Sequence, residues 1–529
     1  MSGRHSTIPP EVGEQIAVRL QRATDERVAE RILAKDDTLW GPAGQPEVAD
    51  RLGWIDVHDR LADNSVSLLA EAAQAQVDGL TDVVVLGMGG SSLAPEVFRQ
   101  SFSPDPEAMR LHVFDSTDAQ ALRDLEATID PERTLFIASS KSGGTIETLS
   151  ALQHFWDRTG GDGSRFCAIT DPGSGLEALA AERGFRRVFS GDPEIGGRYS
   201  ALSPFGIVPA AFAGFDIAAL MAGGSAIAEQ CAEPDATVNP GVNLGCVIGE
   251  LALAGRDKLT FLVDEPVSSF GLWAEQLVAE SLGKHGRGIL PVAGEPVGGP
   301  GDYGSDRVIV AIEGPGGDHT AAVSALRDAG LPVLTLTVEG AADLGALMVL
   351  WEFAVATAGW VLGVNPFDQP NVQSAKDKTS EVLASAPPQI AAASEGDLRA
   401  LLGGAAPSYL AIQAFCAPSA AVEQAAAELR AAVRARTGMA TTFGYGPRYL
   451  HSTGQLHKGG PKTGRFLQVV ADGTPEVGAP APAGGFERLK HAQADGDLLV
   501  LREHGLPAER AACGPDAAAA LRAVAALVG

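Results

Sequence analysis

The strongest constraint on the fold is the order of apolar runs and helical segments between about Thr81 and Val364. Short runs such as DVVVLG, LHVFDS, TLFIAS and FCAIT alternate with helical patterns at the spacing of βαβ units. The runs are continuously apolar, which is typical of parallel strands buried on both faces of a sheet. The sequence therefore predicts an α/β fold built on a doubly wound parallel sheet.

A second series of the same kind follows, with the runs LTFLVD, GILPV, RVIVAIEG and VLTLTV. Helical patterns precede the first series, and further α/β segments follow the second. We therefore expect an N-terminal helical segment over 1–78, two α/β domains over 79–232 and 233–390, and a C-terminal α/β extension over 391–529. The apolar run Ala346 to Val364 contains Glu352, which favours a buried helix over a membrane span.

Composition excludes several classes of partner. The 529 residues carry 66 acidic and 40 basic side chains, a net charge of −26. Such a charge repels nucleic acid and anionic lipid, so we expect neither as a partner. Five scattered cysteines without a C-x-x-C pair indicate a reducing compartment and no metal site. The N-terminus lacks the apolar core of a signal peptide, which favours a cytoplasmic location.

The first of two glycine- and serine-rich loops, LGMGGSSLAP, follows a predicted strand. Gly89 and Gly90 allow close backbone approach, and Ser91 adds a hydroxyl at the start of the next helix. The loop lacks the third glycine of a dinucleotide fingerprint and the G-K-[ST] of a P-loop. It is interpreted either as part of a phosphate site or as an ordinary tight turn.

The second loop, ASSKSGGTIETL, is richer in polar groups. Ser140, Lys141, Ser142 and Thr145 gather at a strand-to-helix junction, where exposed N–H groups and the helix dipole favour an anion. Helix capping accounts for one or two of these side chains but not for all of them. The sequence predicts a compact phosphate pocket, because two such loops in neighbouring βα units meet at the carboxyl edge of a sheet.

Five motifs carry a resemblance to a known family. SSKSGGTIET resembles the sugar-phosphate loop of sugar isomerase (SIS) domains, and EIGGRYSALSPFG, EQLVAESLGK, NPFDQPNVQSAK and LHSTGQ resemble signatures of the phosphoglucose isomerase family. The resemblance spans about Leu86 to Gln455. The chain is also similar, more loosely, to the isomerase half of transaldolase–isomerase fusions. It implies two SIS domains, a homodimer, and isomerisation of glucose 6-phosphate and fructose 6-phosphate through a cis-enediol without metal or organic cofactor.

The resemblance also implies roles for individual residues. Glu280 is the base that moves a proton between carbons 2 and 1, a transfer that suits a carboxylate, and Gln276 lies one helical turn before it. Arg198 stabilises negative charge on the enediolate oxygens. Lys376 lies near the ring oxygen, although residues 371 and 373–375 depart from the usual family pattern.

The histidine that opens the sugar ring is out of its usual order. In most of the family it lies between the motifs that here read EQLVAESLGK and NPFDQP, but this interval holds GGPGDYGSDR, and LHSTGQLHKGG comes later. Because a catalytic site is defined by geometry and not by chain order, we expect His451 to fold back into the site. His285 and the loop from Asp302 to Arg307 remain alternatives, and His457 is expected to be structural or near the phosphate.

Two other functions remain open. The small residues Gly143 and Gly144 replace bulkier ones of many relatives, which is compatible with a dual phosphoglucose/phosphomannose isomerase. A regulator that only binds a sugar phosphate belongs to a different class. That reading predicts a basic helix-turn-helix module, which the sequence lacks.

Overall fold

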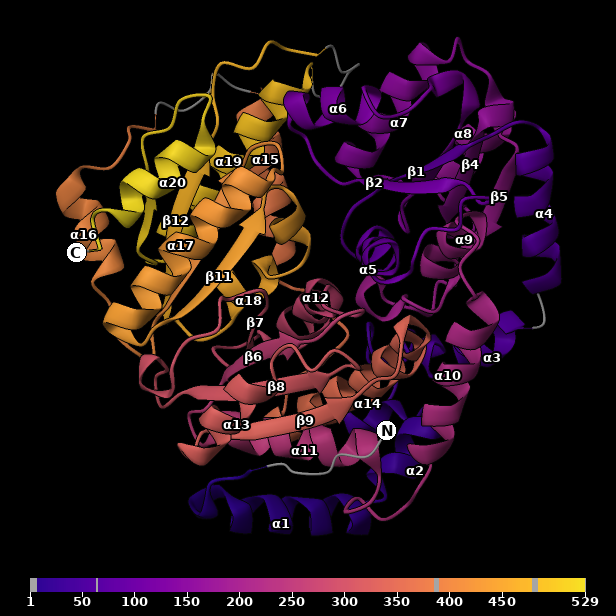
Figure 1. The fold of residues 1–529 in the computed structure, drawn as a ribbon. Helices are drawn as coiled ribbons and strands as arrows, with labels where there is room; N and C mark the ends of the chain where they lie inside the picture. Colours follow the sequence, from indigo (N-terminus) through magenta and orange to yellow (C-terminus); the bar gives the residue numbers. More distant parts are fainter. Residues whose placement is uncertain (1–6, 63–64, 385–389, 478–483, 529) are drawn as a thin grey trace.

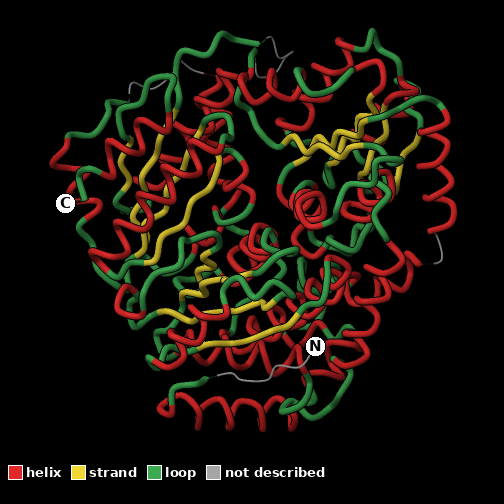
Figure 2. Tube along the Cα trace, viewed as in Figure 1, coloured by secondary structure: helices red, strands yellow, loops and turns green. Residues whose placement is uncertain are grey.

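Three parallel β-sheets flanked by helices make up most of the molecule (Figures 1 and 2). The computed structural model describes residues 7–62, 65–384, 390–477 and 484–528, with backbone only for Ala62 and residues 372–376. The predicted α/β class with doubly wound parallel sheets is confirmed. The C-terminal extension adds a third sheet of the same kind.

The first sheet has the strand order β2-β1-β3-β4-β5. The chain leaves β1 toward one edge and then crosses to β3 on the other side, which creates a switch point between these two strands. Gly87 at the end of β1 pairs with Ser139 at the end of β3, so the two loops predicted to bind phosphate start at the same edge. The bounds are β1 (Asp82–Gly87), β2 (Arg110–Phe114), β3 (Thr134–Ser139), β4 (Phe166–Thr170) and β5 (Arg187–Ser190), with α5 (Leu93–Ser101), α6 (Ala119–Glu126), α7 (Ile146–Arg158), α8 (Gly175–Glu182) and α9 (Pro204–Phe212).

The second sheet has the order β7-β6-β8-β9, and the third has the order β11-β10-β12-β13. The second comprises β6 (Lys258–Val263), β7 (Leu290–Val292), β8 (Arg307–Glu313) and β9 (Val333–Thr337), with α10 (Ile217–Gln230), α11 (Pro240–Leu253), α12 (Phe270–Leu282), α13 (Thr320–Asp328) and α14 (Leu344–Leu362). The third comprises β10 (Tyr409–Phe415), β11 (Ala440–Tyr445), β12 (Gly464–Val470) and β13 (Ala508–Arg510), with α15 (Val372–Ala384), α16 (Glu395–Leu402), α17 (Ala420–Thr437), α18 (Gly454–Gly459), α19 (Phe486–Glu503) and α20 (Ala517–Ala525).

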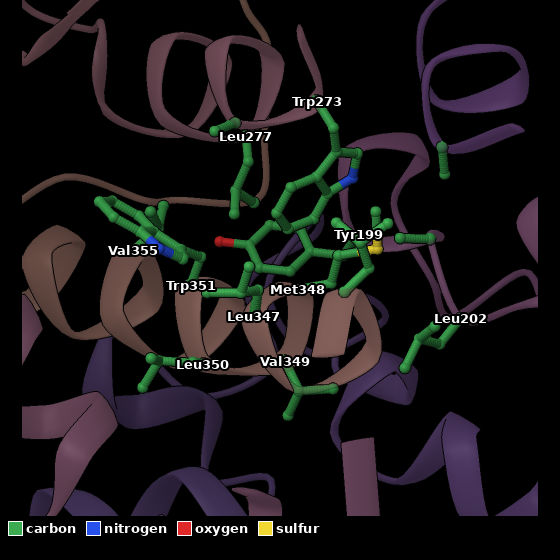
Figure 3. Packing of buried hydrophobic residues seen from close by; sticks show 14 of the residues in the cluster. Tyr199, Leu202, Trp273, Leu277, Leu347, Met348, Val349, Leu350, Trp351 and Val355 are labelled. Carbon is green, nitrogen blue, oxygen red and sulfur yellow. The ribbon is translucent and has the colours of Figure 1, made fainter. Parts of the chain in front are cut away.

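The helix α14 forms the centre of the largest core. It is apolar on all sides, as expected for a helix enclosed by protein, and Figure 3 shows Leu347, Met348 and Trp351 packing toward Tyr199 and Trp273. Among the described residues it is the one helix, counted as Ala341–Leu362, with the length and hydropathy of a membrane span, yet 94% of its apolar window is buried inside the molecule. The predicted buried helix is present.

The N-terminal helices cover the second sheet unit as well as the first. They are α1 (Pro10–Asp25), α2 (Val28–Leu33), α3 (Val57–Ala62) and α4 (Ser65–Val77). Helix α1 lies along α11 (Figure 1), where the Arg19 guanidinium contacts the Glu250 carboxylate at 2.5 Å. The segment is therefore packed as part of the globule, as its amphipathic pattern predicts.

A buried ionic cluster fixes the third sheet unit to the second. Glu295 pairs with Arg307 at 2.9 Å and lies 3.6 Å from Arg434, and its Oε1 accepts a hydrogen bond of 2.7 Å from the Thr441 hydroxyl. Both Glu295 and Arg307 have fully buried side chains. Because a buried charge is tolerated only when it is paired and hydrogen-bonded, this cluster specifies one docking arrangement of the two units.

Candidate active site

The first glycine loop meets two other segments where a side chain would not fit. Gly89 has φ +54°, and a Cβ there would lie 2.9 Å from Gln276 Nε2 and 2.9 Å from the His451 carbonyl oxygen. A Cβ on Gly90 would lie 2.0 Å from the carbonyl oxygen of Gly197. The glycines therefore let the loop, helix α12 and the GGRYS turn approach one another, and Ser91 is buried beside them.

Helix α12 presents Gln276 and Glu280 on one face, as their i, i+4 spacing predicts. Gln276 Nε2 donates to Glu280 Oε2 at 3.0 Å and to the His451 carbonyl at 2.8 Å. Gln276 Oε1 is buried and has no hydrogen-bond partner among the described residues. A hydroxyl of a bound molecule would satisfy this acceptor, so the arrangement points to a polar ligand beside Glu280.

Arg198 lies directly against Glu280. Its Nη1 is 3.2 Å from Glu280 Oε1, and its side chain is 2% exposed. The guanidinium also donates to the carbonyl oxygens of Pro366 and Asp368 and to Gln369 Oε1, at 2.8–3.3 Å. The NPFDQ turn thus holds the cation in one orientation, with its charge beside the carboxylate.

His451 reaches the same place from the C-terminal unit, at the end of the 3₁₀ turn Arg448–His451. Its Nε2 lies 2.9 Å from Glu147 Oε1, and Gln493 Nε2 donates to the same oxygen at 2.7 Å. Burial alone would raise the pKa of Glu147, but the His451 imidazole and these hydrogen bonds lower it below its usual range. A carboxylate whose charged form is favoured therefore holds the imidazole in place.

The second loop gathers its hydroxyl groups but directs its cation elsewhere. The hydroxyls of Ser140 and Thr145 are 2.9 Å apart, and Ser142 is exposed. The Lys141 ammonium pairs with Asp171 and donates to the carbonyl of Asp192 at 3.1 Å. In this arrangement the Ser140 and Thr145 hydroxyls pair with each other, and the lysine points to Asp171.

Lys284, which sequence reasoning did not select, lies within the same cluster. Its Nζ is 2.7 Å from Asp368 Oδ1, and the side chain is fully buried. Burial, with the nearby Arg198 guanidinium, lowers the pKa of Lys284 to about 7 against the pull of Asp368. The lysine at the end of the motif EQLVAESLGK, two residues beyond α12, is the signal that could have found it. By contrast, the predicted Lys376 belongs to α15, and its side chain lies outside the described residues.

The alternative histidine positions are separate from this cluster. His457 is buried and shares a 2.9 Å hydrogen bond with the Tyr409 hydroxyl, and burial lowers its pKa to about 3, which fits a structural role. His285 has an exposed side chain at φ +54° beyond α12. Arg307 of the glycine-rich loop belongs to the buried ionic cluster with Glu295. Among the described residues, no three His, Cys, Asp or Glu side chains have the arrangement of a metal site.

Comparisons with known proteins bear on the same region. The sequence model of the phosphoglucose isomerase family matches residues 13–287. A glucose-6-phosphate isomerase of Rubrobacter xylanophilus is 32% identical over 368 residues, which cover 58% of this chain and 84% of that protein. One from Symbiobacterium thermophilum is 31% identical over 388 residues, covering 63% and 86%.

Solved structures share the architecture. A hypothetical protein, TT0462, of Thermus thermophilus is similar with a TM-score of 0.59 and 27% identity, over 72% of this chain and all of that one. A glucose-6-phosphate isomerase of Chlamydia trachomatis gives a TM-score of 0.58 at 21% identity, over 69% and 85%. At that identity the second likeness concerns the fold alone.

Proposed function

The chain belongs to the phosphoglucose isomerase family, and from that premise we propose that it is an aldose–ketose isomerase interconverting glucose 6-phosphate and fructose 6-phosphate. The observation that carries the proposal is the cluster in which Glu280, Arg198 and the His451–Glu147 pair meet around Gln276. One carboxylate, one fixed cation and one supported imidazole are the groups that this chemistry requires.

The proton transfer is assigned to Glu280. Its carboxylate takes the proton from carbon 2 and returns it to carbon 1, and the electron pair left behind forms the enediolate. Arg198 lies 3.2 Å from Glu280, so its guanidinium is placed to stabilise the negative charge that develops on the adjacent oxygens. The unpartnered Gln276 Oε1 would accept a sugar hydroxyl and hold the chain of the substrate against the base.

Ring opening is assigned to His451. Sugar phosphates enter as rings, so the ring oxygen must gain a proton and a hydroxyl must lose one. An imidazole is a common proton-transfer group in catalysis, and the buried Glu147 carboxylate holds this one in place through the 2.9 Å contact with its Nε2. Lys376 near the ring oxygen, and Ser140 and Thr145 on the phosphate, remain predictions from the family resemblance.

Turnover is tested by coupling glucose 6-phosphate formation from fructose 6-phosphate to glucose-6-phosphate dehydrogenase, with a chelator present throughout. We expect turnover by the purified chain and its loss in Glu280→Gln, which keeps the shape of the side chain but removes the base. Sugar-phosphate binding without turnover by the native chain would favour the regulator, and abolition by chelator would contradict the cofactor-free reaction.

Substrate range and assembly are separate proposals. A Cβ on Gly144 would meet nothing within 4 Å, which leaves room beside the phosphate loop and favours testing mannose 6-phosphate in the same assay. The homodimer and the cytoplasmic location remain proposals from the family resemblance. Because one chain supplies Glu280, Arg198 and His451, activity per chain measured across a dilution series tests whether subunit association is needed.

A further inference from the structure

A cavity lies between the first two sheet units and the C-terminal unit. Its volume is about 620 Å³, and its walls come from α5, α12, β10, β11 and α17. Neither Glu280 nor Arg198 lines it. We call this space the interdomain cavity. It is separate from the candidate active site, although both adjoin α12 and the segment around His451.

The arginine side chains on the cavity wall already have partners. Arg99 forms two hydrogen bonds of 2.8 Å with Glu96, and Arg448 forms two of 2.7 Å with Asp115. Arg430 donates to three backbone carbonyl oxygens at 2.7–2.8 Å. An anionic ligand would therefore lose its hydration without gaining a free arginine as its counter-charge.

The carboxyl of Glu275 also lines this wall. It accepts a hydrogen bond from the backbone N–H of Ala293 at 3.3 Å. Burial raises its pKa to about 7, against the opposing charges of Arg430 and Arg448. Near neutral pH this group is partly protonated, so it also offers a ligand both a donor and an acceptor.

Gln413 on β10 is the polar group without a partner. It lines the cavity and is 1% exposed, and neither its Oε1 nor its Nε2 has a hydrogen-bond partner among the described residues. Gln468 on the neighbouring strand β12 is buried equally, but it donates to the Ala494 carbonyl and accepts from Arg510. Leaving a buried amide unpaired costs about 1–3 kcal/mol. The Gln413 amide is therefore positioned to form hydrogen bonds with a molecule in the cavity.

We propose that the interdomain cavity binds a small, neutral, polyhydroxylated molecule, with the Gln413 carboxamide donating to one hydroxyl and accepting from another. A hydroxyl group both donates and accepts, which matches the two unpaired atoms of the amide. The volume suits such a ligand, since small-molecule sites occupy about 300–1,000 Å³. The proposal does not depend on the isomerase reaction.

Isothermal titration calorimetry with sorbitol tests this site, with gluconate as the anionic molecule of the same length. Sorbitol should bind saturably, one molecule per chain, and gluconate more weakly. Gln413→Leu should weaken sorbitol binding about tenfold or more, because two hydrogen bonds worth about 1 kcal/mol each are lost. The matched control is Gln424→Leu on α17, where the exposed amide contacts only Glu428, and it should bind sorbitol normally.

A second variant tests the site independently, in case the buried substitution Gln413→Leu prevents folding. Ala427 is half-buried on α17 and lines the cavity, so Ala427→Trp should block sorbitol binding while the surface accommodates the ring. The titration is repeated with saturating fructose 6-phosphate, which should leave sorbitol binding intact. No saturable heat would mean that water alone fills the cavity. That result, displacement of sorbitol by fructose 6-phosphate, or tighter binding of gluconate would overturn the proposal.

Discussion

Replacing Glu147 by glutamine removes one negative charge from behind His451 while keeping the size of the side chain. Glu147 is buried, and its Oε1 meets both His451 Nε2 at 2.9 Å and the Gln493 amide. The glutamine can still hydrogen-bond, so the imidazole should stay near its position. What is lost is the electrostatic support of the positively charged imidazole that forms during ring opening.

The size of the effect follows from this contact. A hydrogen bond to a charged group is worth about 1.5–3 kcal/mol and a neutral one about 0.5–1.5 kcal/mol, so losing only the charge costs about 1–1.5 kcal/mol. Since about 1.4 kcal/mol corresponds to tenfold in rate, we expect kcat on the cyclic substrate to fall about tenfold. KM should change little, because Glu147 acts through His451 and is a positioning residue, with no role in binding the phosphate.

The assay is the coupled conversion of fructose 6-phosphate, compared with proton exchange on an open-chain analogue that needs no ring opening. The analogue should exchange at a nearly native rate. Glu126→Gln is the matched control, because Glu126, at the end of α6, pairs at 3.1 Å with His154, which lies on the same helix α7 as Glu147. An unchanged kcat in Glu147→Gln, or an equal loss with both substrates, would refute the assigned role of the His451–Glu147 pair.

Three further predictions concern stability, each measured by urea unfolding. Gly90→Ala should cost about 1–3 kcal/mol, because its Cβ would overlap the Gly197 carbonyl, whereas Gly144→Ala, with open space around it, should be nearly neutral. Glu295→Gln should cost about 3–5 kcal/mol by leaving Arg307 buried without its ion pair, and an effect as small as that of the exposed control Glu30→Gln would contradict this role. Burial raises the pKa of Glu352 in the folded protein well above 4.5. Below pH 4.5 the carboxyl is protonated in both the folded and the unfolded protein. As the pH rises above that value only the unfolded protein ionises, which lowers the free energy of unfolding by up to about 1.4 kcal/mol per pH unit. The free energy of unfolding of Glu352→Gln should therefore exceed that of the native protein by an amount that increases from about pH 5 to about pH 7. A difference that is independent of pH would show that the carboxyl ionises in the folded protein.

The predictable part of the fold is local. Continuous apolar runs such as those of β1 and β3 predict buried parallel strands, and this places both glycine- and serine-rich loops at one edge. The i, i+4 spacing places Gln276 beside Glu280 without any knowledge of the fold. Both features depend on backbone geometry over a few neighbouring residues, and the local residue pattern is enough to predict such geometry.

The less predictable part is the choice of partners across long separations. A chain-order argument leaves the place of His451 open, and only the docking of the C-terminal unit brings its carbonyl to Gln276, 175 positions earlier. Nothing in SGGTIET marks Glu147 as the carboxylate behind that imidazole, because a glutamate in the first turn of a helix is also expected from the helix dipole. The direction of Lys141 toward Asp171 depends equally on a neighbouring strand.

The position of His451 also bears on when this protein becomes active during its synthesis. Glu280 and Arg198 leave the ribosome early, whereas the imidazole follows Gln276 by 175 residues, roughly 10–35 s at an elongation rate of about 5–20 residues per second. Gln493, which supports Glu147, emerges later still. A nascent chain that has folded its first two sheet units would thus still lack the group proposed to open the ring, so we expect isomerisation to begin only after translation has passed α19.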